Sequence, residues 1–205
     1  VTFAGSEFGT DGLVNSDAVT SVTLVSGGAA ATAQVGDFPI VASAAVGSGL
    51  DNYTISYSDG TLTVGKKALT VTADDGSKTY GQTVTFAGAE FGTDGLVNTD
   101  TVTSVSLASA GAAATAQVGD FPIVASAAAG SGLTNYEITY NDGTLTVNKA
   151  ALTLTADNKS RGYGDANPAL TATFSGFKNG ETLATSGVTG TPVLRTTSLA
   201  TVVYF

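Results

Sequence analysis

The chain has 205 residues, a formal net charge of −9 from 17 acidic and 8 basic side chains, and neither cysteine nor histidine. These absences exclude disulfides, Ser-His-Asp and Cys-His catalysis, and the nitrogen and sulfur ligands of zinc and copper sites. Because the charge balance is acidic, we expect no nucleic-acid binding. Because no apolar run approaches the length of a membrane span, we expect no membrane insertion in this segment. Abundant glycine and short runs of Val, Ile, Thr and Tyr indicate an all-β protein.

The sequence repeats itself at a constant offset of 83 residues. Val1 to Gly65 recurs as Val84 to Asn148 without a gap, and roughly four positions in five are identical. A divergent third copy follows, so the chain is a tandem array. We predict three repeats: residues 1–66, lacking the N-terminal strand, residues 67–148, complete, and residues 149–205, truncated at the C-terminus.

The complete repeat consists of short alternating segments separated by glycine, asparagine and aspartate, which is typical of strands and turns. In chain order we predict a strand at 68–73, a turn at Tyr80-Gly81, strands at 84–87 and 104–109, an Ala-rich hairpin reaching 121–125, a Gly-rich loop at 130–132, and strands at 136–140 and 144–147. The last two strands form a closing hairpin, whose turn ends on Gly143 in a positive-φ conformation. Because the chain starts at Val1 without Met and stops inside the strand-like TVVYF, we expect it to be a fragment.

One segment of each repeat differs from the strands and predicts a short helix. Within residues 95–102, Asn98 can cap the helix and Asp100 can lie in its first turn, near the positive end of the helix dipole. The fold class that we predict is therefore all-β with one short helix per repeat. The counterparts in the other copies are Asn15, Asp17, Asn179 and Glu181.

The differences between the first two copies fall on alternate positions of the predicted closing hairpin. Successive strand residues point to opposite faces, so the unchanged residues should face the core and the changed residues should face water. We interpret the unchanged tyrosines as core residues rather than as a sugar-stacking surface. The unchanged residues are Tyr53, Ile55 and Tyr57 in the first copy and Tyr136, Ile138 and Tyr140 in the second.

The links between the repeats are short. Residues 65–67 separate the first two repeats, and residues 148–150 separate the second from the third. A three-residue link between strands leaves little room for independent tumbling. We therefore expect the neighbouring repeats of the same chain to be partners in a stiff, extended array.

Two acidic pairs raise the alternative of glycosidase-type acid and base catalysis. They are Glu7 with Asp11 and Glu90 with Asp94, which occupy equivalent positions in two copies. An active site is usually assembled once, so a catalytic pair duplicated intact is implausible. We interpret these residues as solvated loop charges and predict no catalytic residue and no enzymatic activity.

The only metal chemistry left open by the composition is oxygen ligation of a hard cation such as calcium. The candidate ligands follow the first strand of the second and third repeats. In a turn, however, Asp and Asn side chains ordinarily satisfy backbone groups, and we predict no cofactor on that reading. The calcium candidates are Asp74, Asp75, Asp157 and Asn158.

Three sequence stretches carry a family resemblance: ALTLTAD from residue 151, RGYGDANPALTATFSGFKNGE from residue 161, and DNYTISYSDGTLTV from residue 51. Together they resemble the MBG domain of the YGX type and its YDG-type relatives, which are repeats of large extracellular bacterial proteins. Asn-Pro follows the Tyr-Gly motif only in the third repeat, at Asn167-Pro168. The resemblance implies a small immunoglobulin-like or β-grasp-like module in tandem, with no catalytic residues to transfer.

The resemblance and the near-identical copies together imply a structural stalk of an adhesin at the bacterial cell surface or secreted from the cell. In this hypothesis the repeats hold a distal binding region away from the cell, and other parts of the parent protein contact host or environmental glycans. The alternative is that each repeat is a weak glycan- or mucin-binding module acting by multivalency.

Overall fold

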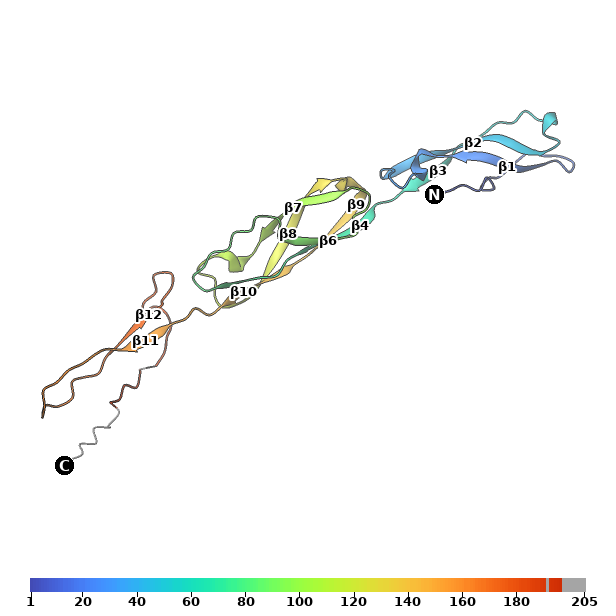
Figure 1. Ribbon diagram of the computed structural model, residues 1–205. Coiled ribbons are helices and arrows are strands. Elements are labelled where there is room, and N and C mark those ends of the chain that lie inside the picture. Colours follow the sequence, from blue (N-terminus) through green and yellow to red (C-terminus); the bar gives the residue numbers. More distant parts are fainter. Residues whose placement is uncertain (191, 197–205) are drawn as a thin grey trace, which may run out of the picture. The chain divides into compact units, whose positions relative to one another are not determined.

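The computed structural model describes residues 1–190 and 192–196, and the strand-like segment predicted at 201–205 lies outside these residues. The described part of the chain consists of β-strands, four single-turn 3₁₀ segments and loops, with no α-helix (Figure 1). The all-β prediction is therefore confirmed. Each 3₁₀ segment spans three residues: η1 Gly27–Ala29, η2 Leu50–Asn52, η3 Ala110–Ala112 and η4 Leu133–Asn135.

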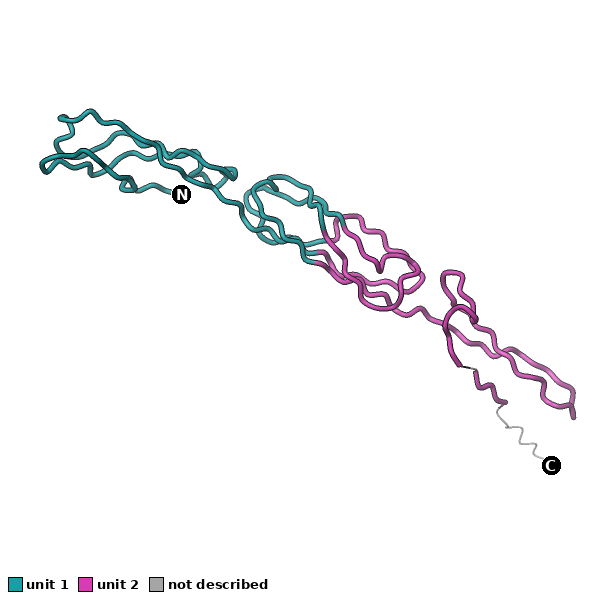
Figure 2. The backbone as a smooth tube through the Cα atoms, turned by 180° about the vertical axis from the view of Figure 1, so that it is seen from behind, with its two compact units in different colours: residues 1–72, 91–106, 126–141 teal, residues 73–90, 107–125, 142–205 magenta. Residues whose placement is uncertain are grey.

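The chain forms two compact units, which Figure 2 distinguishes by colour. Unit 1 contains residues 1–72, 91–106 and 126–141, and unit 2 contains residues 73–90, 107–125 and 142–205. The middle repeat contributes residues to both units. The predicted repeat boundaries follow the internal sequence identity, which this division does not test, so they stay a prediction.

In the first repeat, β1, β2 and β3 form an antiparallel sheet in that order. The pairing of β1 with β2 shifts in register near Ala44, which has a positive φ of 48° and marks a bulge. Residues 54–58, which carry the predicted strand with Ile55 and Tyr57, are not paired in any sheet. The strand bounds are β1 Ala18–Val25, β2 Gly36–Ser48 and β3 Gly60–Val64.

The middle repeat has two sheets, with strand orders β6-β4-β9 and β5-β10-β8-β7. Two of the pairings are parallel, β4 with β9 and β5 with β10, and both join strands that are far apart in the sequence. The bounds are β4 Lys67–Ala73, β5 Gly76–Thr79, β6 Phe91–Asp94, β7 Thr101–Ala108, β8 Gly119–Ser131, β9 Tyr136–Asn141 and β10 Gly143–Asn148.

The buried apolar side chains of the described residues belong to the middle repeat. Along β4 and along β10, buried residues alternate with less buried ones, as expected for strands with one face toward a core. Within unit 1 the buried residues are Leu69, Val71, Val105 and Tyr136, and within unit 2 they are Ala73, Ile123, Ala125, Leu145 and Val147.

The third repeat has a single pair of described strands, β11 Thr153–Ala156 and β12 Ala172–Ser175, which pair antiparallel. The strand predicted at residues 151–156 agrees with β11 at its C-terminal end, but β11 begins two residues later, at Thr153. All six residues of this segment are exposed. The third repeat therefore presents a strand without the buried face that its counterpart β4 has in the middle repeat.

Two of the predicted elements are wrong. Residues 84–87 form no strand, and the chain instead has β5 before them and β6 after them. Residues 95–102 form no helix: Asn98 adopts a left-handed φ of 58°, and the Asp100 amide donates to the Val97 carbonyl at 3.2 Å, which closes a reverse turn. Asparagine tolerates this conformation, whereas a helix would require a negative φ.

The predicted closing hairpin is also wrong, although both of its strands exist as β9 and β10. These strands lie in different sheets and pair with β4 and β8, not with each other. Gly143 does not have a positive φ. It is required for close approach, because a Cβ there would lie 2.6 Å from the carbonyl oxygens of Ala73 and Asp74.

Candidate functional sites: capped turns, repeat junctions and an open groove

Three residues of the predicted acidic pairs, Glu7, Asp11 and Glu90, lie in loops, and Asp94 is the last residue of β6. The two glutamates accept hydrogen bonds from backbone amides. The Glu90 carboxylate accepts hydrogen bonds from the amides of Ala87, Gly88 and Ala89 at 2.9–3.0 Å. The amide of Ala87 makes the largest contribution to a lowered pKa of Glu90. A general acid needs the opposite shift, because it must hold a proton near neutral pH.

Glu7 repeats this arrangement in the first repeat. Its carboxylate accepts from the Ala4 amide at 2.9 Å and from the Ser6 amide at 3.1 Å, and the Ala4 bond is the main cause of its lowered pKa. Asp11, its predicted partner, accepts from the Gly12 amide at 2.9 Å. Both glutamates thus act as anionic acceptors of local backbone donors.

This arrangement predicts an acid-sensitive component of stability. The folded pKa of Glu90 lies below its ordinary value of 4.5, so its stabilising effect is present above that pH and is lost as the pH falls through the folded pKa. We expect the free energy of unfolding to decrease less steeply toward acid in Glu90→Gln than in the parent. Urea unfolding followed by circular dichroism between about pH 2 and pH 6 measures both slopes, and equal slopes would contradict this role.

The calcium candidates lie in the loops that follow β4 and β11, and two of them already accept hydrogen bonds from protein donors. Asp75 Oδ1 accepts the Thr144 amide at 2.7 Å, and Asp157 accepts the hydroxyls of Thr171 and Thr173. The Thr171 hydroxyl is the main cause of a lowered pKa of Asp157. Asp74 and Asn158 are exposed, and no group of three or more acidic side chains gathers within the described residues. The expectation of no metal, with calcium as the alternative, is not tested by these contacts and stays a prediction.

The reverse turn that replaces the predicted helix is fixed by a tyrosine. Tyr136 is buried, and its hydroxyl donates to Asp100 Oδ2 at 2.9 Å and accepts the Val97 amide at 3.0 Å. Burial, followed by the hydrogen bond to Asp100, raises the pKa of Tyr136. The first repeat has the same set in Tyr53, which donates to Asp17 at 2.9 Å and accepts the Val14 amide at 2.9 Å. Tyr136 is therefore a core residue, and in both repeats the tyrosine hydroxyl holds the turn in place by hydrogen bonds.

A junction between the first and middle repeats lies within unit 1. Asn135, at the end of η4, donates from Nδ2 to Gln34 Oε1 at 2.9 Å and accepts the Val35 amide at 3.0 Å on Oδ1. Residues 31–35 and 97–100 line a common pocket of about 300 Å³ beside this contact. Asn135 bonds two residues of the preceding repeat, whereas its counterpart Asn52 donates only to the nearby Gly49 carbonyl, at 3.2 Å.

The junction between the middle and third repeats lies within unit 2. The Tyr80 hydroxyl donates to Glu181, and this hydrogen bond is the main cause of a raised pKa of Tyr80. Asn179 donates to the Ala114 carbonyl at 3.1 Å, from a turn in which Asn179 has a left-handed φ of 51°. Asn179 is the counterpart of Asn98, whose turn lines the pocket at the first junction, but the hydrogen bonds at that junction are made by Asn135.

Sequence reasoning missed Gln34, Asn135 and Lys78, and it named Tyr80, Asn179 and Glu181 only as parts of a turn or of a short helix. Lys78 is buried, and its ammonium group donates to the carbonyls of Gln82 at 2.9 Å and of Ala113. A signal existed, because Gln34 and Asn135 belong to positions that are identical in the first two copies, and a basic residue, Arg161, recurs at the position of Lys78. Because roughly four positions in five are identical between the first two copies, identity alone did not distinguish these residues from the other unchanged residues.

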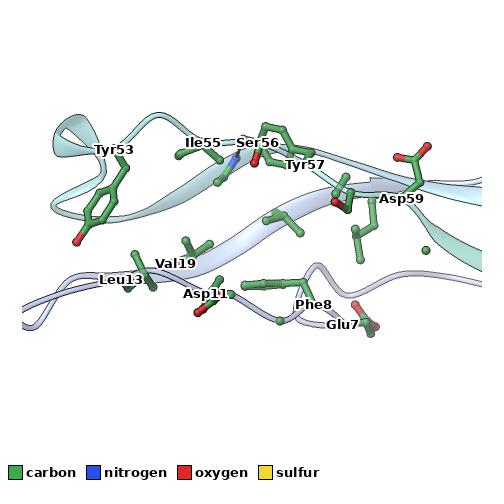
Figure 3. Close-up of a pocket in the computed structure, with 18 of the residues that line it drawn as sticks. Glu7, Phe8, Asp11, Leu13, Val19, Tyr53, Ile55, Ser56, Tyr57 and Asp59 are labelled. Atoms are coloured by element: carbon green, nitrogen blue, oxygen red, sulfur yellow. Dashed lines mark hydrogen bonds between the residues drawn. The ribbon is translucent and has the colours of Figure 1, made fainter.

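The first repeat contains an open groove of about 550 Å³ (Figure 3). Tyr53, Ile55 and Tyr57 lie along one side of the groove, and the segment from Glu7 to Leu13 lies along the other. Side chains of β1 and β2 form its floor, among them Val19, Val22, Leu24, Ile40 and Ala42. In contrast to the prediction, Ile55 and Tyr57 are exposed, whereas Ile138 and Tyr140 in the middle repeat are half-buried.

Repeated all-β modules, which share a tyrosine-bonded turn in the first and middle repeats, define a tandem structural repeat protein. The chain belongs to the MBG domain (YGX type) family, whose sequence model matches residues 2–63, 69–146 and 152–202. Domains of this family occur in surface proteins and are generally structural modules without enzymatic activity. No curated protein and no solved structure matches the chain. Among the described residues, no helix is long and apolar enough to cross a membrane.

Proposed function

We propose that this chain is a stalk segment of a bacterial adhesin, at the cell surface or secreted, whose repeats hold a distal binding region away from the cell. The observation that carries the proposal is that hydrogen bonds join each repeat to the next. Asn135 bonds Gln34 and Val35 at one junction. At the other junction, Asn179 bonds the Ala114 carbonyl and Glu181 bonds the Tyr80 hydroxyl. A repeated contact of this kind orients each module on the one before it.

The links support the same proposal. Only Gly65 and Lys66 separate β3 from β4, because Lys67 already belongs to β4, and residues 149–152 separate β10 from β11. A link of two residues joining two strands restricts the angles between the modules that it connects. A stalk needs this restriction, since freely rotating modules would shorten its reach.

A non-enzymatic role agrees with the chemistry of the acidic residues. Glu7 and Glu90, the strongest candidates for acid and base catalysis, bond to backbone amides that lower their pKa. The family relation to surface proteins supports an extracellular location. The proposal includes neighbouring repeats as the partners of this segment, with glycan contacts made elsewhere in the parent protein.

Asn135→Ala tests whether the junction contact orients the modules. The variant loses the hydrogen bonds to Gln34 and Val35, so we expect a broader distribution of interatomic distances in small-angle scattering of the variant than of the parent. Asn52→Ala is the matched control, because Asn52 bonds only within its own loop. It should leave the distribution unchanged.

Two outcomes of the scattering experiment would contradict the proposal. One is a parent chain that scatters as a compact globule. The other is a parent distribution as broad as that of Asn135→Ala, which would mean that the modules reorient freely despite the junction. An elongated parent with a defined maximum dimension, lost in Asn135→Ala and kept in Asn52→Ala, is the expected result.

A further inference from the structure

Lys78 is a buried charged side chain that the stalk proposal does not use. It lies on β5 and is 5% exposed, and its ammonium group donates to the carbonyls of Gln82, at 2.9 Å, and of Ala113. Burial of an ammonium group is unfavourable unless acceptors replace the water that it loses. Because the two acceptors belong to loops that are far apart in the sequence, Lys78 joins these loops to each other.

The first of the two loops is the Tyr-Gly turn, residues 79–82. The Gln82 amide donates to the Thr79 carbonyl at 3.0 Å, and the Thr79 amide donates to Gln82 Oε1 at 2.8 Å. The Tyr80 amide donates to the carbonyl of the last residue of β10 at 2.8 Å. The turn is therefore closed on itself and attached to the sheet of its own repeat.

The second loop begins at the end of η3 and presents three successive carbonyls to the Tyr-Gly turn and the residues after it. The Ala112 carbonyl accepts the Val84 amide at 2.9 Å, and the Ala114 carbonyl accepts the Gly81 amide at 3.1 Å. The carbonyl between them, that of Ala113, accepts the buried ammonium group. The ammonium group therefore lies in the middle of the contact between the two loops.

The third repeat contacts both loops. Asn179 Nδ2 donates to the Ala114 carbonyl at 3.1 Å, and the same carbonyl accepts the Gly81 amide. Glu181 accepts the hydroxyl of Tyr80, which belongs to the Tyr-Gly turn. The groups that bond the third repeat are thus carried by the two loops that the buried ammonium group joins.

Gly81 allows the third repeat to approach the turn closely. A Cβ at this position would lie 2.6–2.8 Å from the first three side-chain carbons of Lys178. Gly81 also has a positive φ of 93°, a conformation that glycine adopts without strain. The contact therefore requires both the glycine and the fixed conformation of the turn around it.

The third repeat closes its own Tyr-Gly turn in the same way with different residues. Arg161 stands at the position of Lys78. Its Nη1 donates to the Asp165 carbonyl at 2.9 Å, which is the counterpart of the bond to the Gln82 carbonyl. Asp165 Oδ2 also accepts the Gly162 amide at 3.1 Å, as the Gln82 side chain accepts the equivalent amide. The bond from a basic side chain to the turn is thus kept although the residues differ.

We propose that Lys78 is the positioning residue of the junction between the middle and third repeats. Its ammonium group holds the Tyr-Gly turn and the loop 112–116 in the shape that receives residues 178–181 of the following repeat. The partner that fits this surface is a turn with an asparagine and, two positions later, an acidic residue. This role rests on the proposed stalk function, because it concerns a contact that orients one repeat on the next.

Hydrogen exchange of single amides in Lys78→Met, measured by NMR, tests this role. Methionine keeps an unbranched apolar side chain but donates no hydrogen bond, so the variant should fold. We expect the amides of Gly81 and Val84 to lose about tenfold or more of their protection, because the loop that accepts them is no longer held in place. The Asp74 amide, which donates to the Glu90 carbonyl at 3.0 Å, should keep its protection.

A second measurement reports on the third repeat itself. Since the chain has no cysteine, Thr144→Cys on β10 and Thr155→Cys on β11 provide two exposed sites for spin labels. Double electron–electron resonance should give a narrow distribution of label distances in the otherwise unchanged chain and a broader one when Lys78→Met is added. A residue that only stabilised the middle repeat would change the free energy of unfolding and leave this distribution unchanged.

Two variants serve as controls. Lys78→Arg keeps a basic donor of the kind that Arg161 supplies in the third repeat, so it should retain both the protection and the narrow distribution. Lys159→Met removes the charge of an exposed lysine in the loop after β11, and it should also leave both measurements unchanged.

Three results would overturn the proposal. The first is a narrow distribution with unchanged protection in Lys78→Met, which would remove the role of Lys78 and leave the stalk proposal standing. The second is an equal loss of protection at Asp74, Gly81 and Val84, because the lysine would then stabilise the whole repeat and not the two loops. The third is a distribution that is already broad with Lys78 present, which would contradict the stalk proposal as well.

Discussion

Leu69→Ala should lower the free energy of unfolding of the middle repeat by about 2–5 kcal/mol, whereas Leu152→Ala should change that of the third repeat by less than about 1 kcal/mol. The two leucines occupy the same position of the repeat. Leu69 is fully buried on the central strand of its sheet, and Leu152 is 40% exposed. The cost comes from the lost apolar contacts and from the cavity that remains, and both are largest for Leu69, because Leu152 is partly in water already.

Hydrogen exchange measured by mass spectrometry checks this prediction repeat by repeat. Peptides from β9 and β10 report opening of the middle repeat, and peptides from β11 and β12 report opening of the third. Equal losses of protection for Leu69→Ala and Leu152→Ala would contradict the assignment of the core to the middle repeat. They would mean that the strand 151–156 is buried in solution.

Gly130→Ala should have the second large effect, a loss of about 3 kcal/mol in the free energy of unfolding of the middle repeat. Gly130 lies near the end of β8, where β7 begins alongside it. A Cβ at this position would lie 1.8 Å from the Thr101 carbonyl oxygen, so the backbone of β7 would have to move. Movement would also strain the hydrogen bonds of the Thr101 amide and hydroxyl to Ser131 Oγ, both 3.0 Å long.

Gly92→Ala is the matched control for Gly130→Ala. Gly92 lies in β6, and a Cβ there would meet no atom within 4 Å. Alanine also restricts the unfolded chain more than glycine does, so we expect a change of less than about 1 kcal/mol in either direction. Denaturant unfolding of both variants provides the comparison. Similar unfolding midpoints would contradict the prediction, because they would mean that the backbone of β7 can move without loss of stability.

Local patterns were sufficient for several elements. Alternation predicted β4 over 68–73, and the structure extends it by one residue to Lys67. The drift between copies placed Tyr136, Ile138 and Tyr140 on one face of a strand, and these are the less exposed residues of β9. Both inferences depend only on the two-residue period of a strand, which any half-buried strand must follow.

The predicted helix and the predicted hairpin were wrong because each rests on a short segment whose sequence suits two different structures. The Asn-x-Asp segment at 98–100 suits a helix start or a reverse turn, and the Tyr136 hydroxyl, 36 residues away in sequence, selects the turn by binding Asp100. Likewise, Asn141-Asp142-Gly143 suits a hairpin turn, but β9 and β10 have partners in different sheets. In each case a contact that is distant in sequence decided between the alternatives.

The sequence by itself determined the tandem array, the all-β class, the strand periodicity and the family, because each depends on residue identity, spacing or composition along the chain. Tertiary structure alone decided the parallel pairings of β4 with β9 and of β5 with β10, and the contacts at the repeat junctions. These contacts join residues that are far apart in the sequence, so no local pattern of residues can specify them.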